Sequence, residues 1–208
     1  MYFITFFCFD ANAKFLFQKY FIDFHKGITF LYILALINYY DAFNNITIWV
    51  YLGLHGTYGI LWVMKSLIFP DKSWEIKTGF LYGLFILTGL SLYWISPWII
   101  VSGYFNNGDM ISLPLWIISA CIFLFGVGVF LHFSSDMQKH TALKLNPGNL
   151  VMDGLFSKSR NMNYFGELLI YISFALLSMH WIPFAVLLVF IISSGCRHAY
   201  LTFVLVLR

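Results

Sequence analysis

Charged side chains are scarce in this chain: Asp, Glu, Lys and Arg together make up only 10% of its 208 residues. Soluble domains carry about 25% charged residues, so this inventory cannot cover a surface that faces water. Hydrophobic residues make up 61%, and the 24 Phe, 13 Tyr and 7 Trp suit lipid-facing surfaces and the aromatic belts of membrane interfaces. We therefore expect a protein that resides in a lipid bilayer.

Cysteine is rare as well, with isolated residues at Cys8, Cys121 and Cys196. The odd number and the lack of any CxxC pair argue against a disulfide framework and against a structural zinc site. The net charge is only +3 and no basic run occurs, so we expect no nucleic-acid partner. The apolar start MYFITFFCF lacks a positive region and is interrupted by Asp10, which argues against a cleaved signal peptide.

Long apolar segments dominate the rest of the chain. A helix needs about 20 mostly apolar residues to cross a bilayer, and six segments approach this requirement: roughly 27–41, 46–65, 78–100, 110–133, 163–179 and 182–196. The last two are short and adjacent, which indicates a helical hairpin with Pro183 in a first helical turn. The sequence therefore predicts one all-α domain, a multi-pass transmembrane helical bundle of about six spans.

The positions of the basic residues test this topology independently. With six spans, all 12 Lys and Arg residues fall on the side that holds both termini, and the positive-inside rule makes that side cytoplasmic. The chain then divides into an interfacial amphipathic segment (1–26), the first four transmembrane helices (27–133), a cytoplasmic polar loop (134–162), and a helical hairpin with a short tail (163–208).

One face of the second predicted span carries a stripe of polar and aromatic residues, formed by Tyr51, His55, Tyr58, Trp62 and Lys65 at spacings of three and four. An ionisable residue inside a span is costly and usually faces the bundle interior or a cavity. One interpretation is a substrate pocket wall in which His55 or Tyr58 donates a proton. The other is helix packing with one internally hydrogen-bonded histidine. Lys65, at the end of the span, is expected to snorkel to the interface.

The longest polar interval of the chain runs from His132 to Glu167. His132, Asp136 and His140 recur every four residues, as metal ligands could. A helix that leaves the membrane with its polar face toward the cytoplasm explains the same spacing, so we expect no metal. A haem held by His55 and His132 is a further alternative.

The fifth predicted span begins near Ser159, Asn161 and Asn163, each of which can cap a helix. Free backbone N–H groups there, beside Lys158 and Arg160, would suit a phosphate or a carboxylate. An anionic cofactor at the cytoplasmic mouth of the bundle is one interpretation. A capped helix with basic topology anchors is the other.

Three short motifs lie in or beside this interval: Ser135-Asp136-Met137-Gln138-Lys139, Gly154-Leu155-Phe156 and Asn163-Tyr164-Phe165-Gly166-Glu167. Together they resemble the C-terminal half of steroid 5α-reductase-type membrane proteins, and especially the uncharacterised DUF1295-type branch. The resemblance covers about residues 130–178, while the match over residues 1–129 is one of helical layout only.

The resemblance implies a membrane reductase of the endoplasmic reticulum that uses NADPH to reduce a carbonyl-conjugated C=C bond of a steroid or other lipid. It implies that Asp136, Asn163, Tyr164 and Glu167 hold the cofactor, and that Lys139, Lys144 and Arg160 could meet its phosphates. Negative charge builds on the substrate carbonyl oxygen during hydride transfer, so a positioned donor is needed. His55 and Tyr58 are candidates for this donor from the residues themselves, not from the family.

The sequence departs from the family pattern in three places. Its basic residues after Asp136 are lysines, which bind phosphate without bidentate geometry, so NADH is an alternative to NADPH. Arg160-Asn161-Met162 replaces Arg-His-Pro, and residues 196–208 lack the family's polar tail. Two other functions therefore stay open: a related isoprenylcysteine or phospholipid methyltransferase that uses S-adenosylmethionine, and a non-catalytic reductase-like scaffold or complex subunit.

Overall fold

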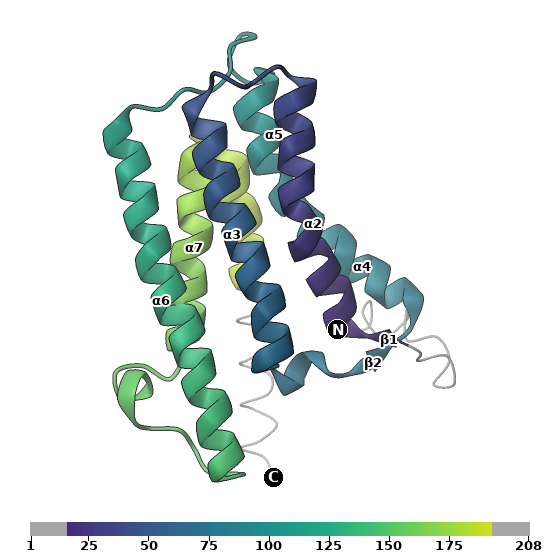
Figure 1. Cartoon of the computed structure of the whole chain (residues 1–208), viewed down its shortest axis with the longest axis vertical. Coiled ribbons are helices and arrows are strands. Elements are labelled where there is room, and N and C mark those ends of the chain that lie inside the picture. The colour runs from purple at the N-terminus through teal and green to yellow at the C-terminus, as the bar shows by residue number, and fades with distance from the viewer. Residues whose placement is uncertain (1–15, 193–208) are drawn as a thin grey trace.

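The computed structural model describes residues 16–192, and this part of the chain is a bundle of helices (Figure 1). The only described strands are the two-residue segments β1 (Leu16–Phe17) and β2 (Lys77–Thr78), which pair antiparallel. The prediction of an all-helical, multi-pass bundle is confirmed. The ends of the interfacial segment and of the short tail, residues 1–15 and 193–208, lie outside the described residues.

Four helical segments are long and apolar enough to cross a membrane. They are α2 (Gln18–Tyr39), α3 (Ile46–Ile68), the composite segment Phe80–Ser102, and α6 (Leu115–Leu145). Two shorter apolar helices follow, α7 (Met162–Ser178) and Trp181–Ile192. At about 1.5 Å per residue, a helix of 20 residues covers the roughly 30 Å of hydrocarbon in a bilayer.

Two helices extend further than the sequence pattern predicts. The first span begins at Gln18 rather than near residue 27, so residues 18–26 belong to α2 and not to a separate interfacial helix. Likewise α6 continues to Leu145, so the predicted polar loop starts as helix. In both places some of the polar residues that suggested a membrane boundary, such as Lys26 and Asp136, are buried, and the helical backbone hydrogen bonds continue past them.

The third span is bent rather than straight. It consists of α4 (Phe80–Ser91), the 3₁₀ turn η2 (Leu92–Trp94) and α5 (Ile95–Ser102), and Figure 1 shows α4 leaning away from the bundle. Pro97 lacks a backbone N–H and cannot continue the α-helical ladder, which explains a change of direction here. The hydroxyl of Tyr32 on α2 donates a hydrogen bond to the Trp94 carbonyl at 3.4 Å.

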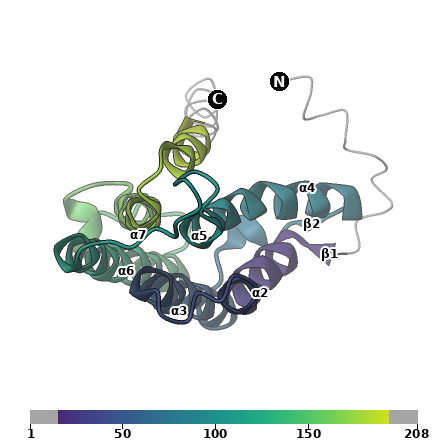
Figure 2. The same ribbon diagram turned by 90° about the horizontal axis from the view of Figure 1, so that it is seen from above.

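Seen from above, α6, α3 and α2 form one row, and α7 and α5 lie behind it (Figure 2). The core lies between the two rows of helices. Its fully buried side chains include Ile33 of α2, Tyr51 and Tyr58 of α3, Cys121 of α6 and Ile170 of α7. After α7, a turn at Met179 with φ 44° leads to the helix Trp181–Ile192, which has Pro183 in its first turn.

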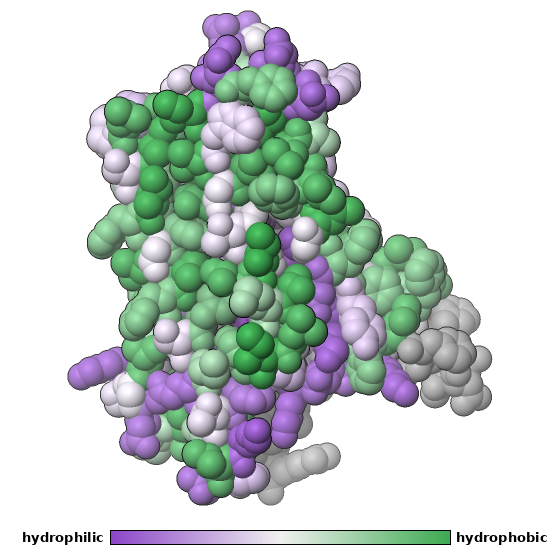
Figure 3. All heavy atoms as spheres, viewed as in Figure 1, coloured by the Kyte–Doolittle hydropathy of each residue, from purple (hydrophilic) through white to green (hydrophobic). Residues whose placement is uncertain are grey.

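Apolar residues cover most of the middle of the molecular surface, and hydrophilic residues gather at its two ends (Figure 3). This distribution fits a protein whose middle is surrounded by lipid, so the chain is an integral membrane protein. The described Lys and Arg residues lie on the segments at one end, where α2 begins and where α3 and α6 end. By the positive-inside rule we expect this end to face the cytoplasm.

Candidate functional site

Two glycines bring α6 and α7 into closer contact than larger residues would allow. A Cβ atom on Gly166 would lie 2.4 Å from the backbone N of His132, and one on Gly128 would lie 2.7 Å from the Gly166 carbonyl O. Small residues permit such close approach between membrane helices. The contact places Asn163 and Glu167, which flank Gly166 on α7, against the polar end of α6.

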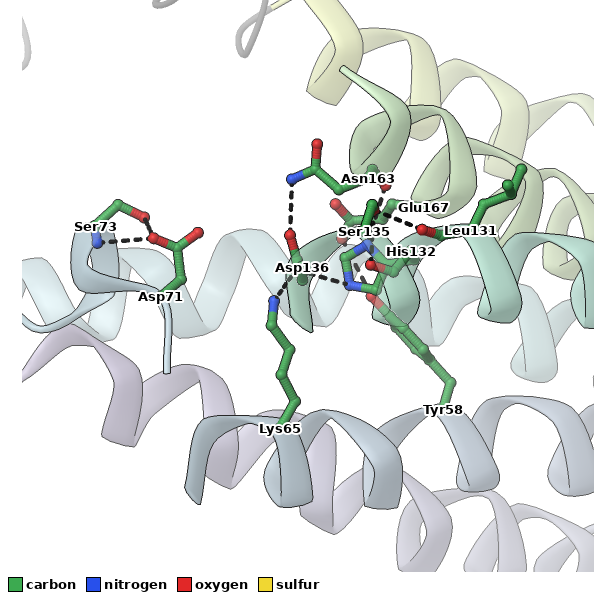
Figure 4. Close-up of polar contacts among 10 residues, drawn as sticks. All are labelled: Tyr58, Lys65, Asp71, Ser73, Leu131, His132, Ser135, Asp136, Asn163 and Glu167. Atoms are coloured by element: carbon green, nitrogen blue, oxygen red, sulfur yellow. Dashed lines mark hydrogen bonds and ion pairs between the residues drawn. The ribbon is translucent and has the colours of Figure 1, made fainter. Parts of the chain in front are cut away.

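Asp136 of α6 is the centre of a buried polar group. Its Oδ2 forms an ion pair with Nζ of Lys65 from α3, and its Oδ1 accepts a hydrogen bond from Nδ2 of Asn163 at 3.0 Å (Figure 4). The three residues are only 5–7% exposed. A buried charge is stable only with a close partner, so these contacts tie α3, α6 and α7 together at one point.

His132 lies one turn before Asp136 on α6 and is 3% exposed. Its Nδ1 donates a hydrogen bond to the Asn163 carbonyl O at 3.0 Å, and because a carbonyl can only accept, Nδ1 carries a proton. The Nε2 atom is 3.8 Å from Oδ2 of Asp136 and has no hydrogen-bond partner within residues 16–192. One buried imidazole nitrogen of His132 therefore lacks a hydrogen-bond partner in the described part of the chain.

A second polar contact joins α3 to α7. The Tyr58 hydroxyl donates a hydrogen bond to Oε1 of Glu167 at 3.1 Å, and the Tyr58 side chain is fully buried (Figure 4). Tyr58 and Lys65 are two helical turns apart, so both project from the same face of α3. We call the resulting set the polar cluster; it comprises Tyr58, Lys65, His132, Asp136, Asn163 and Glu167.

Lys26 of α2 borders the polar cluster and is 3% exposed. Its Nζ donates a hydrogen bond to the Tyr171 hydroxyl of α7 at 2.6 Å and lies 4.3 Å from the centre of the Tyr58 ring. A fourth helix thus contributes to the same region, and it contributes a positive group.

His55 lies outside the polar cluster. Its Nδ1 is 3.0 Å from the Tyr51 hydroxyl, within hydrogen-bonding distance, and its ring stacks on Phe174 with ring centres 4.3 Å apart. Of the two predicted donors, only Tyr58 is joined to Asp136, Asn163 and Glu167 through the cluster. The contacts of His55 are those of a packed, internally hydrogen-bonded histidine.

The other predicted cofactor residues lie at the rim. Lys144 and Arg160 are exposed, Lys139 is half-buried, and Tyr164 is 43% exposed. None of them belongs to the buried cluster, so any ligand they bind must approach from the water-facing end of the bundle.

Asp71, in the loop after α3, is a further acidic group at this end. Burial alone would raise the pKa of its carboxyl, but hydrogen bonds from the N–H and hydroxyl of Ser73, with the charges of Lys139 and Lys65, lower it overall. Asp71 is therefore a carboxylate at neutral pH.

The sequence pattern missed two buried residues of this region and misjudged a third. Lys65 was expected to snorkel to the interface, and this was wrong: it is buried and paired with Asp136, which offers a partner inside the bundle. Its place in the Tyr51–Lys65 stripe was a usable signal, as was the spacing of His132 to Asp136. Nothing in the pattern singled out Lys26 or Tyr171, which meet only through packing of distant helices.

Two small pockets flank the polar cluster. One lies where α2 begins and α3 ends, and its lining includes Asp23, Trp62 and Lys65. The other lies between η2, α5, α7 and the helix Trp181–Ile192, and its lining includes Tyr93 and Tyr171. Each has room for about one water molecule. No group of three or more His, Cys, Asp or Glu side chains suited to a metal ion occurs in the described part of the chain.

Comparison with known proteins gives this arrangement a context. The model of the DUF1295 family, described as a protein of unknown function, matches residues 69–205. The chain belongs to the DUF1295 family. The DUF1295 family is a steroid 5α-reductase-like family. Neither the curated proteins nor the solved structures yielded a significant match to this chain.

The DUF1295 match begins directly after α3 ends, so it contains α6 and α7 but neither α2 nor α3. Asp136, Asn163 and Glu167 therefore lie in the family region, whereas Tyr58 and Lys65 lie outside it. The polar cluster is built across this boundary.

The polar side chains of the DUF1295 region are of the types that could bind a nicotinamide dinucleotide. The unpartnered Nε2 of His132, the amide of Asn163 and the Glu167 carboxylate can meet the hydroxyl and carboxamide groups of such a molecule. Lys139, Lys144 and Arg160 at the rim can meet phosphates as point charges or bidentate donors.

Proposed function

We propose that this protein is a membrane oxidoreductase that reduces a carbonyl-conjugated C=C bond of a steroid or other lipid with NADPH. One observation carries the proposal: a buried polar cluster lies inside a lipid-embedded bundle. Ionisable groups at such depth are costly, and they commonly mark substrate sites or proton pathways. A structural role alone would be served by apolar packing at lower cost.

Within this proposal, Tyr58 is the donor to the substrate carbonyl oxygen. Its hydroxyl is held by Glu167 at 3.1 Å in the structure, so a bound substrate oxygen would replace Glu167 as the acceptor. A fixed donor in a dry, low-dielectric site stabilises developing negative charge far better than one in water. The packed position of His55 against Phe174 favours Tyr58 over His55 for this role.

The cofactor, when bound, supplies the hydride. Asp136, Asn163, Tyr164 and Glu167 would hold its nicotinamide and ribose end, and Lys139, Lys144 and Arg160 its phosphates. The lysines leave the choice between NADPH and NADH open to measurement. Placement in the endoplasmic reticulum is part of the same proposal.

A non-catalytic scaffold is the second candidate, and one observation favours it. Lys65, Asp136 and Asn163 are paired with one another, so this part of the cluster is already satisfied without a ligand. In that case the cluster would only fix the positions of α3, α6 and α7.

The deciding experiment is a thermal-stability titration of the purified full chain with NADPH, NADH and S-adenosylmethionine. A ligand that binds only the folded state raises its stability, by about 2.7 kcal/mol at 100 times its Kd. We expect NADPH to raise the unfolding temperature. Stabilisation by S-adenosylmethionine alone would support the methyltransferase, and stabilisation by none of the three would support the scaffold.

Two variants link the binding to the cluster. Asn163→Ala and Glu167→Ala are expected to weaken NADPH binding about tenfold, because each removes a hydrogen-bonding group at about 1–1.5 kcal/mol. Asn149→Ala, in the exposed turn after α6, is the matched control and should bind as the original chain does. Unchanged NADPH affinity in both cluster variants would disprove these residue roles.

A further inference from the structure

Lys26 differs from the other buried lysine in having no carboxylate in direct contact with its ammonium group. Lys65 is paired with Asp136, whereas no carboxylate oxygen of residues 16–192 lies within 4 Å of Lys26 Nζ. Lys26 is nevertheless only 3% exposed. A positive charge in a membrane bundle without a carboxylate in direct contact is costly, even with Glu167 attracting it from further away. Its retention therefore calls for a role that depends on its chemistry.

Aromatic groups surround the Lys26 ammonium. Its Nζ lies 4.3 Å from the centre of the Tyr58 ring, 4.9 Å from Trp62 and 5.1 Å from Tyr171, and it donates to the Tyr171 hydroxyl at 2.6 Å. Ring faces attract a cation, and more strongly where water is excluded. Unlike a carboxylate, these rings stabilise the ammonium group of Lys26 without binding its proton.

The backbone fixes Lys26 in this place. A Cβ atom on Gly59 would lie 2.2 Å from the Lys26 carbonyl O, so only glycine allows α2 and α3 to meet here. Because Gly59 follows Tyr58 directly, this contact sets the Lys26 side chain over the Tyr58 ring.

Tyr171 connects Lys26 with a pocket. Its hydroxyl accepts the hydrogen bond from Lys26, and its side chain forms part of the wall of the small pocket between η2, α5, α7 and the helix Trp181–Ile192. Tyr93, on the same wall, stacks on Tyr171 with ring centres 4.4 Å apart and fixes its orientation. The pocket is small, and its lining is mainly aromatic and apolar, so a lipophilic group that enters it has to displace these side chains.

We propose that Lys26 stores the proton consumed in the reaction and that Tyr171 passes it to the lipid substrate. The proposal rests on the function proposed above. Once hydride has reached the β-carbon, the Tyr171 O–H bond breaks and a C–H bond forms at the α-carbon of the enolate. An N–H bond of Lys26 then breaks and restores the Tyr171 hydroxyl, which leaves a neutral amine that solvent reprotonates.

Lys26 suits this task better than Lys65 does. Loss of a proton from Lys65 would leave the buried Asp136 carboxylate without its ion-pair partner, whereas Lys26 forms no ion pair within the described residues and interacts with Glu167 only from beyond 4 Å. The titratable and charged groups that interact with Lys26 are Tyr58, Lys65 and His55 from α3, Tyr171 and Glu167 from α7, and His25 on α2 itself.

The test is a fluorine NMR titration of the full chain labelled with 5-fluorotryptophan, in detergent micelles. Trp62 lies 4.9 Å from Lys26 Nζ and its ring does not titrate, so its resonance, assigned with Trp62→Phe, reports the charge on Lys26. We expect a pH-dependent step in this resonance. The step should vanish in Lys26→Met and Lys26→Arg and persist in Lys72→Met, which alters an exposed lysine.

His132 also stacks on Trp62, and any step that it produces will remain in Lys26→Met. Absence of a Lys26-dependent step in the original chain would overturn the inference even if NADPH binds. Conversely, a step in a chain that neither NADPH nor NADH stabilises would refute the proposed function and, with it, the donor role.

Measuring kcat distinguishes a Lys26 that donates a proton from a Lys26 that contributes only its positive charge. With 4-cholesten-3-one as substrate, we expect kcat to fall about 100-fold in Lys26→Met and in Tyr171→Phe, as for other general acids, with unchanged NADPH affinity. Arginine keeps the charge but does not release its proton, so Lys26→Arg should not restore kcat. Full activity in Lys26→Arg would reduce Lys26 to an electrostatic role.

Discussion

The α2–α3 pair and the α6–α7 pair use the same packing device at their contacts. In the first pair Gly59 allows α3 to touch the Lys26 carbonyl, and in the second Gly166 allows α7 to touch the His132 backbone. Each contact sets functional side chains beside the glycine, namely Tyr58 in one pair and Asn163 with Glu167 in the other.

The two pairs differ in the chemistry they contribute. The α2–α3 pair supplies Lys26, Lys65 and the Tyr58 hydroxyl, all of which donate hydrogen bonds across the interface. The α6–α7 pair supplies the acceptors Asp136 and Glu167. Neither pair alone could bury these groups without uncompensated charge, so the polar cluster exists only where the two pairs meet.

The DUF1295 match covers the acceptor pair and leaves out the donor pair. Motifs within α6 and α7 therefore describe one side of the site, and its other side has to be found from contacts. The experiments below probe the junction between the pairs first and then each pair by itself.

Asp136→Ala should have the largest effect on stability. It leaves Lys65 charged and buried without a partner, which costs about 3–5 kcal/mol. Unfolding by SDS in mixed micelles, followed by far-ultraviolet circular dichroism, measures the change.

The double variant Lys65→Met with Asp136→Leu is the control for Asp136→Ala. It removes both charges at similar volume, and we expect it to recover most of the lost stability, since buried pairs are often replaceable by apolar packing. Equal destabilisation in the single and double variants would mean that the ion pair does not join the two helix pairs.

Gly59→Ala and Gly166→Ala should each destabilise the fold by about 1–3 kcal/mol, through overpacking within one pair. The added Cβ atoms would lie 2.2 Å and 2.4 Å from backbone atoms of the neighbouring helix, which cannot move aside as a side chain can.

Gly53→Ala and Gly126→Ala are matched controls, on α3 and α6, because no atom lies within 4 Å of the added Cβ. Alanine is the better helix former, so these variants should be neutral or slightly stabilising. The same SDS unfolding applies, and a neutral Gly166→Ala would contradict the close contact of α6 with α7.

Asp71→Asn should have the smallest effect, a few tenths of a kcal/mol, as expected for a partly screened charge. The folded state lowers the pKa of Asp71 below its ordinary 3.8. The carboxylate therefore contributes stability above pH 3.8, and this contribution is lost as pH falls through the folded-state pKa.

The measurement is the difference in unfolding temperature between Asp71→Asn and the original chain as a function of pH. The deficit of the variant should shrink on acidification. Because Lys139 of α6 contributes to the lowered pKa, Lys139→Met should reduce the same deficit. A deficit that grows as pH falls would contradict the assigned direction.

Much of the acceptor side could be predicted from sequence. The spacing of Asn163 and Glu167 places both on one side of α7, the side that meets α6. Asp136 is the first charged residue after the apolar part of α6. The rim lysines and Arg160 were expected to share the site, yet the structure leaves Lys144 and Arg160 exposed. A charge near a membrane boundary looks the same in sequence whether it anchors the helix, binds a ligand or pairs inside.

The sequence by itself determined the membrane bundle, the number of its apolar segments and the gathering of positive charge at one end, because composition and periodicity fix which faces must avoid water. Only the tertiary structure decided the pairing. Lys65 meets Asp136 across 71 residues, and Lys26 meets Tyr171 across 145. Helical periodicity specifies the face on which a side chain lies, but the helix opposite that face is chosen by packing, here by the glycines that let backbones touch.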